Sequence, residues 1–186
     1  GNSSSTAAST RVTYSWGVFA TKDGSVTGNR IANANSIAKK SSKFILPGYT
    51  LATNILYEIR LVVTMISTQK VATTSILVFV APSPIVAIVS GGHQRGVPAG
   101  GDLILDGSTS YDPDQRYLKG VDAQLEYIWT CRQISPQPMD SCLFNMDTID
   151  SSYFRLRANE FTLGTESVIT MIIKHPIGQR TDQTKV

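Results

Sequence analysis

Long hydrophobic runs are absent from this chain of 186 residues. The longest apolar candidate, residues 55–66, is interrupted by Glu58 and Arg60, whereas a helix that crosses a bilayer needs about 20 apolar residues. The opening GNSSSTAAST lacks both the charged and the apolar region of a signal peptide, so any secretion signal would lie outside this chain. We expect no membrane span in this fragment.

A concentrated charge of one sign is also missing. The 17 Lys and Arg residues exceed the 14 Asp and Glu residues only slightly, and no aromatic residues interleave with the densest basic group, Lys39, Lys40 and Lys43. A nucleic-acid surface combines basic side chains with aromatic rings on which bases stack, so we expect no nucleic-acid partner. Hydrophobic residues make up 41% of the chain and charged residues 17%, which indicates a globular protein rather than a disordered one.

The residues and motifs of common enzymes are scarce. The two histidines, His93 in SGGHQRG and His175 in KHPIG, each stand alone in loop-like sequence, so we expect both to be solvated. Neither Gly-x-Ser-x-Gly, nor His-Glu-x-x-His, nor a Walker sequence accompanies them. The sequence therefore predicts a protein that is not an enzyme and that needs no cofactor.

Alternation of apolar and polar residues is what the chain does have. VTYSWGV (12–18) and ILYEIRLVVTM (55–65) place apolar side chains at every second position, which is typical of half-buried strands. Further strand-like stretches, most of them bounded by Gly, Pro, Asn or Asp, are residues 73–80, 84–90, 101–106, 123–131, 153–157 and 167–174. Only residues 29–43 have helical composition, and a short helix or a loop is open there. We expect an all-β fold, most simply a sandwich.

A weak internal repeat indicates two copies of one module. Tyr14 and Trp16 match Tyr127 and Trp129 at an offset of 113 residues. At an offset of 110, four apolar pairs match: Phe44 with Phe154, Leu46 with Leu156, Leu51 with Phe161 and Leu61 with Met171.

Two prolines mark the boundary between the copies. Pro82 and Pro84 cannot donate to a strand ladder, so we expect domains at 1–82 and 83–186. Only residues 1–11 precede the Tyr-x-Trp strand of the first copy, against about forty in the second, so the first copy is expected to be incomplete at its N-terminus. Both ends then look cut from a longer chain.

The segment LDGSTSYDPD, residues 105–114, contains Asp106, Asp112 and Asp114. Asp beside Gly or Pro, with Ser and Thr nearby, favours turns that hydrogen-bond to their own backbone, so a structural turn is the first interpretation. Carboxylates gathered in one loop also suit calcium, although the spacing lacks the final glutamate of an EF-hand loop. Paired-carboxylate catalysis is a third interpretation, but no second acidic segment obviously faces this one.

The two cysteines, Cys131 and Cys142, enclose ten residues that include two prolines. This is not the spacing of a metal site, and no histidine cluster accompanies it. A disulfide that braces the loop is favoured, and it would place the protein in an oxidising space, whereas two free buried thiols would suit the cytosol. Asn2 in Asn-Ser-Ser is a candidate glycosylation site, compatible with secretion.

ILDGSTSYDPD followed by LEYIWTC resembles the PKD-type immunoglobulin-like module, in which an acidic turn precedes a Tyr-x-Trp strand. The cysteine after that Trp, and FILPGYTLATNILYEIRLVVTM in the first copy, are closer to the REJ region of receptor-for-egg-jelly proteins and polycystin receptors. The first copy departs from the second, because it has Val18 where the second has Cys131.

This resemblance implies tandem immunoglobulin-like or fibronectin III-like sandwiches in an extracellular, non-enzymatic ectodomain. It assigns structural roles to the acidic turn and to four core aromatic residues, Tyr14, Trp16, Tyr127 and Trp129. The function it implies is spacing and adhesion at a cell surface or ciliary membrane, with other extracellular modules or matrix glycans as partners. An accessory, substrate-positioning domain of a secreted hydrolase is the alternative.

Overall fold

The structure, a computed structural model, describes residues 11–22 and 25–186, with the backbone alone at 22, 25–29 and 148–150. The described chain is all-β, as predicted, and its sheets are antiparallel. It divides into two compact units, Gly1–Pro82 and Ser83–Val186, which meet at the Pro82 to Pro84 junction. Each unit is described by itself below. Within the described ranges, no helix is long and apolar enough to cross a membrane.

The described residues of unit 1 form one sheet of four strands in the order β2-β1-β3-β4. The strands are β1 (Val12–Lys22), β2 (Ser25–Arg30), β3 (Ile55–Met65) and β4 (Val71–Val80). In the register, Trp16 lies opposite Leu61, which in turn lies opposite Thr74. The alternating apolar residues of β1 and β3 therefore share one face, as period-two sequences require.

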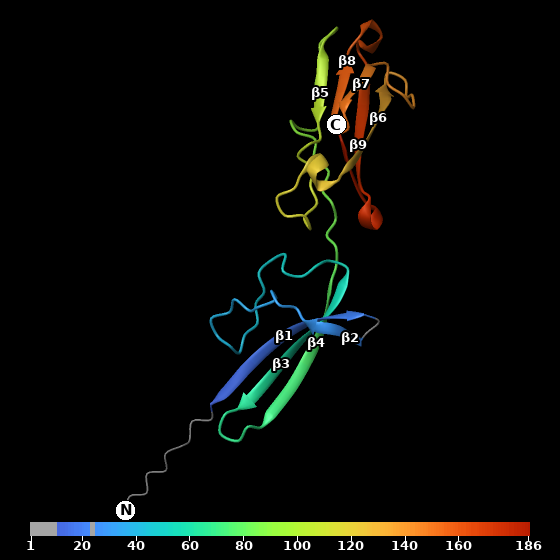
Figure 1. Ribbon diagram of the computed structural model, residues 1–186. Coiled ribbons are helices and arrows are strands. Elements are labelled where there is room, and N and C mark those ends of the chain that lie inside the picture. The colour runs from blue at the N-terminus through green and yellow to red at the C-terminus, as the bar shows by residue number, and fades with distance from the viewer. Residues whose placement is uncertain (1–10, 23–24) are drawn as a thin grey trace, which may run out of the picture. The chain divides into compact units, whose positions relative to one another are not determined.

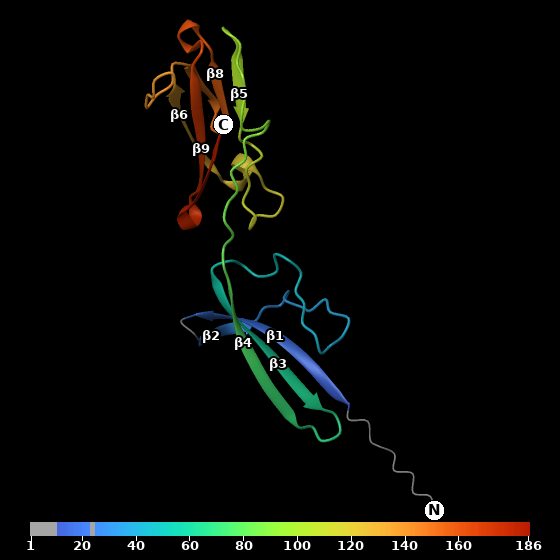
Figure 2. The ribbon, with the colours of Figure 1, turned by 180° about the vertical axis from the view of Figure 1, so that it is seen from behind.

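One end of that face is covered by the segment between β2 and β3, drawn in cyan beside the sheet (Figures 1 and 2). Val18, Ala34 and Tyr57 are buried there, and apolar side chains pack around them: Ala20, Ile31, Phe44, Leu46, Leu51, Ile55, Ile59 and Val80. The helical alternative for residues 29–43 is wrong. Residues 29–30 end β2, and residues 31–43 form turns and loop. Ile37 of the apolar stripe is largely exposed, whereas Ile31 and Ala34 pack in the cluster.

Unit 2 contains two sheets of three strands, ordered β10-β9-β6 and β5-β8-β7. The strands are β5 (Asp102–Asp106), β6 (Glu126–Ser135), β7 (Asn145–Asp150), β8 (Tyr153–Arg157), β9 (Glu166–His175) and β10 (Arg180–Lys185). Three 3₁₀ turns, Gly120–Ala123, Glu160–Thr162 and Ile177–Gln179, join them. Side chains of both sheets enter one hydrophobic cluster, among them Leu105, Cys131, Phe154, Leu156, Ile169, Met171 and Ile173.

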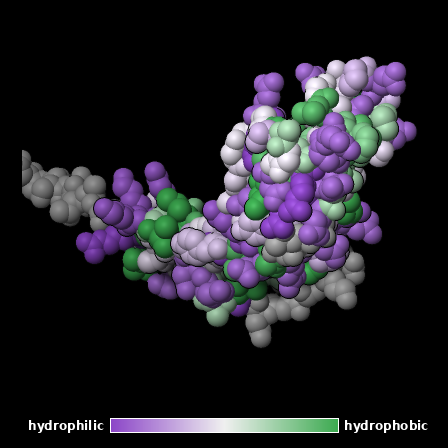
Figure 3. All heavy atoms as spheres, turned by 90° about the horizontal axis from the view of Figure 1, so that it is seen from above, coloured by the Kyte–Doolittle hydropathy of each residue, from purple (hydrophilic) through white to green (hydrophobic). Residues whose placement is uncertain are grey.

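The strand expected at residues 84–90 does not form. Val86 makes only an isolated bridge with Tyr111, while Ile85 and Val89 enter the core of unit 2. The apolar run at residues 84–90 therefore indicates burial in the core rather than a strand paired in a sheet. In the view of Figure 3, hydrophobic residues reach the surface at several places among hydrophilic ones. In unit 1, Ile76, Leu77 and Phe79 of the edge strand β4 are more than half exposed.

Candidate functional site

The acidic segment 105–114 folds as a chain of turns after β5. The backbone N–H of Ser108 donates to Asp106 Oδ1 over 2.8 Å, and the N–H of Asp114 donates to Asp112 Oδ1 over 3.0 Å. Each of these carboxylates thus accepts from the backbone two residues ahead and closes a local turn, as the turn interpretation expects. Gly107 lets the turn pack closely against β9, since a Cβ there would overlap Met171 Sδ.

Arg180 at the start of β10 anchors this turn. Its Nη2 donates to Asp112 Oδ2 over 2.7 Å, and its Nη1 donates to Asp112 Oδ1 over 2.9 Å and to Asp114 Oδ2 over 3.0 Å. Asp112 is 1% exposed, so the guanidinium compensates a carboxylate that water hardly reaches. Ser83 joins the same group, donating its N–H to Asp114 Oδ2 and accepting from Arg180 Nη1.

His175 also lies in this network, and the expectation that it is solvated is wrong. It is the last residue of β9, is 3% exposed, and its Nε2 lies 2.8 Å from Gln115 Nε2 and 3.8 Å from Asp112 Oδ2. His93 is exposed, with Nδ1 3.0 Å from the carbonyl oxygen of Lys185. Neither Gln115 nor Arg180 stood out in the sequence, because each lies at least 60 residues along the chain from one of its partners.

The electrostatics of the network stabilise the ionised carboxylate. Burial by itself raises the pKa of Asp112, but hydrogen bonds from Arg180 and from the N–H of Asp114, with the attraction of Arg180, outweigh it, so that the pKa lies below the ordinary value of 3.8. The hydrogen bond with Asp112 raises the pKa of Arg180. Both groups therefore stay charged at neutral pH.

These contacts show what the acidic turn can do. The carboxylate oxygens of Asp112 and Asp114 face a guanidinium and backbone N–H groups, which join three distant segments of unit 2. Asp106 serves a turn of its own. Among the residues that the structure describes, no group of three His, Cys, Asp or Glu side chains is placed to hold a metal ion. The arrangement is suited to fixing segments in place.

The disulfide between Cys131 and Cys142 is present, with the two Cα atoms 5.5 Å apart. Cys131 is a core residue of β6, and Cys142 packs against the same cluster. The bond therefore ties the loop after β6 back to the hydrophobic core. Asn2 lies outside the described residues.

Each unit has one Trp, and the two Trp residues have matching surroundings. The Trp16 ring stacks on Phe44 with centroids 5.1 Å apart, and Trp129 stacks on Phe154 at 5.3 Å. Trp16 Nε1 donates to the carbonyl of Ser41, and Trp129 Nε1 donates to that of Ser151.

None of the four aromatic residues predicted as core is fully buried. Trp129 and Tyr127 are half-buried and pack against the buried cluster of unit 2. Trp16 and Tyr14 are half-buried as well, and Trp16 stacks on Phe44, which packs against the cluster of unit 1. They border the hydrophobic cores rather than fill them.

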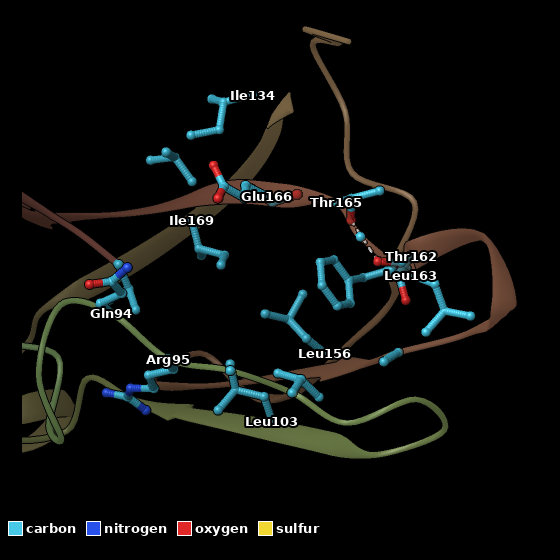
Figure 4. A pocket seen from close by; sticks show the side chains of 18 of the residues that line it. Gln94, Arg95, Leu103, Ile134, Leu156, Thr162, Leu163, Thr165, Glu166 and Ile169 are labelled. Atoms are coloured by element: carbon cyan, nitrogen blue, oxygen red, sulfur yellow. Dashed lines mark hydrogen bonds between the residues drawn. The ribbon is translucent and has the colours of Figure 1, made fainter. Parts of the chain in front are cut away.

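A pocket of about 490 Å³ opens in unit 2 (Figure 4), and no sequence pattern predicted it. Leu103 and Leu156 line one side and Ile134, Glu166 and Ile169 the other, so the pocket lies between the two sheets. Its volume is within the range of small-ligand sites. The lining is mixed. Aliphatic side chains share it with Arg95 and Glu166 and with the hydroxyl groups of Thr162, Thr165 and Ser167.

Comparisons with known proteins point to one family. The family model described as the REJ domain matches residues 2–186, which include both units. Human Polycystin-1 is 30% identical over 96 residues, an alignment that covers 52% of this chain and 2% of that protein. No solved structure matches the chain.

Proposed function

Since this chain belongs to the REJ domain family, we propose that it is a non-enzymatic structural module in the ectodomain of a large polycystin-like cell-surface protein. The family match over nearly the whole chain carries the proposal. The disulfide supports an oxidising, extracellular space, because such bonds are rare where thiols are kept reduced. Glycosylation of Asn2 and a position on a ciliary membrane belong to the same proposal.

We further propose that unit 2 is an immunoglobulin-like or fibronectin III-like sandwich and that unit 1 is a second copy of the same design, incomplete at its N-terminus. In immunoglobulin domains, strands C, F and G form one sheet, and B, E and D belong to the other. The six strands β5 to β10, taken as B to G, reproduce these two groups. In unit 1, β1, β3 and β4 correspond to C, F and G, and β2 is an added strand beside C.

A tyrosine in unit 1 supports this assignment. Tyr57 lies near the start of β3, and its hydroxyl accepts from the N–H of Ala52 over 3.0 Å and donates to the Ala52 carbonyl over 3.3 Å. A tyrosine near the start of strand F whose hydroxyl bonds to backbone a few residues upstream is a hallmark of these sandwiches. The matched Trp–Phe pairs support the view that both units are copies of one module.

Such modules in series act as a semi-rigid spacer. Antiparallel ladders hold each module together, and exposed loops and edges are available to other ectodomain modules or to matrix glycans. In unit 1 the exposed apolar residues of β4 are the natural surface for a neighbouring strand, because an edge strand offers unpaired backbone groups.

Pulling on the two termini in an optical trap tests the proposal. We expect two separate unfolding events, one for each unit. The disulfide spans 11 residues with Cα atoms 5.5 Å apart, so its reduction should lengthen the release of unit 2 by about 34 Å at ~3.6 Å per extended residue.

The double variant Cys131→Ala, Cys142→Ala serves as the control and should show the longer release without reductant. A single event for the whole chain, or a release that reduction leaves unchanged, would contradict the proposal.

A further inference from the structure

The pocket of unit 2 lies where unit 1 has the ring of Tyr57. The register shows this directly: Trp16 lies opposite Leu61 in unit 1, and Trp129 lies opposite Met171 in unit 2. Four residues before these partners on β3 and β9 stand Tyr57 and Ser167. Tyr57 lies opposite Ala20, and Ser167 lies opposite Gln133. These neighbours correspond as well, because each stands four residues after the Trp of its unit.

In unit 1 the phenol ring fills this position. Tyr57 is 4% exposed and belongs to the buried cluster with Val18 and Ala34. Ser167 is one of the residues that line the pocket, and its side chain lacks a ring. The space that the Tyr57 ring fills in unit 1 is therefore open in unit 2.

In unit 1 the Tyr57 hydroxyl bonds to the backbone of the turn before β3. The corresponding turn of unit 2, before β9, is held without a tyrosine. Asn159 accepts from the N–H of Phe161, and the hydroxyl of Thr162 donates to the Asn159 carbonyl over 2.7 Å. The hydroxyl of Thr165 donates to the Thr162 carbonyl over 2.9 Å, a bond drawn in Figure 4. The backbone that a tyrosine would cap is thus already satisfied, while the volume of the ring stays unfilled.

Two residues that line the pocket each have a buried polar atom without a partner among the described residues. These atoms are Ser167 Oγ on β9 and Arg95 Nε in the loop before β5. A buried polar atom without a hydrogen bond is unfavourable, so a ligand with a hydroxyl gains from pairing with either of them.

We propose that this pocket binds a tyrosine side chain of a partner polypeptide. The inference rests on the proposed correspondence of the two units. The aliphatic side chains of Leu103, Leu156 and Ile169 suit the ring, and the unpaired Ser167 hydroxyl and Arg95 Nε suit the phenol oxygen. A polypeptide is the occupant because apolar residues also surround the opening, where Leu163 is 64% exposed and Ile134 is 42% exposed, and a peptide backbone covers them.

The test uses the whole chain with N-acetyl-tyrosinamide as the probe and methyl NMR as the readout. We expect saturable shifts of the Leu156 and Ile169 methyl groups with a dissociation constant of about 1 mM, ordinary for so small a ligand. N-acetyl-phenylalaninamide, which lacks the hydroxyl, should bind about fivefold more weakly, as should the tyrosine probe with the Ser167→Ala variant. Equal binding of the tyrosine, phenylalanine and leucine amides, or no binding, overturns the proposal.

The variant Ser167→Tyr separates this inference from the repeat on which it rests. If the units correspond, the new ring fills the pocket, raises the melting temperature of unit 2 and abolishes probe binding. Lys174→Tyr, at an exposed position of the same strand, is the matched control and should do neither. Stabilisation by Ser167→Tyr together with a wild-type chain that binds no probe would leave the repeat intact and overturn the binding site. Loss of stability with no probe binding would overturn both.

Discussion

Replacing Arg180 with Met should destabilise unit 2 strongly. The methionine keeps an apolar stem but removes the three hydrogen bonds that Arg180 donates to Asp112 and Asp114. Asp112, which is 1% exposed, then keeps hydrogen bonds from the Asp114 N–H and Gln115, with His175 Nε2 3.8 Å away, but no guanidinium to compensate its charge. Breaking a buried pair from one side typically costs about 3 to 5 kcal/mol. For a domain of about 100 residues this lowers the melting temperature by about 12 °C or more.

The assay is thermal unfolding followed by ¹⁹F NMR of the chain labelled with 5-fluorotryptophan. The chain has two Trp residues, Trp16 in unit 1 and Trp129 in unit 2, so each unit has its own signal. The control is Arg157→Met, because Arg157 makes a similar two-bond contact with Asp102 but both side chains are well exposed and water screens the pair. We expect this control to melt nearly as the wild type does. Equal effects of the two substitutions would refute the anchoring role of Arg180.

Four further outcomes follow from the same contacts. Gly107→Ala should destabilise unit 2 by about 1 to 3 kcal/mol, because the added methyl overlaps Met171, whereas Gly96→Ala, which meets no atom within 4 Å, should be nearly neutral in urea unfolding. Removing the disulfide with Cys131→Ala, Cys142→Ala should cost about 3 kcal/mol by the same measurement, and a neutral result would show that the loop is already fixed without it. Because the pKa of Asp112 is lowered on folding, its contribution to stability is present above the ordinary pKa of 3.8 and disappears as the pH falls through the lower folded value. In melts from pH 6 to pH 2, the melting temperature of Asp112→Asn should therefore fall less steeply than that of the wild type. Calcium should raise the melting temperature only modestly relative to chelator, since Asp112 and Asp114 already face Arg180, and a large difference between the two melts would show that the acidic turn is a calcium site.

The sequence predicted the strands that lie inside the sheets better than those at the edges. β1, β3, β8 and β9 each have neighbours on both sides and show apolar residues at alternate positions. The strands that were missed, β2, β7 and β10, are all at the edge of a sheet. Their sequences, SVTGNR, NMDTID and RTDQTK, carry no apolar alternation, because a strand exposed to water needs no hydrophobic face and is defined by its partner.

The acidic turn was predictable in its local part only. Asp106 and Asp112 bond to backbone two residues ahead, which the neighbouring Gly and Pro residues indicate. Arg180 stands 68 residues after Asp112 and has no local signal, since only the pairing of β10 with β9 brings it to the turn. The pocket was not predictable for a related reason. An empty space reflects a missing side chain, and Ser167 becomes informative only when the registers of the two units show that it is the counterpart of Tyr57.

The central claim is that two separate units of one design, the first of them incomplete, follow each other in this chain. The two ¹⁹F signals of the Arg180→Met variant test it most directly. The account predicts that the Trp129 signal melts at a much lower temperature while the Trp16 signal melts as in the wild type. A shift of both signals by the same amount would mean one cooperative core and would contradict it.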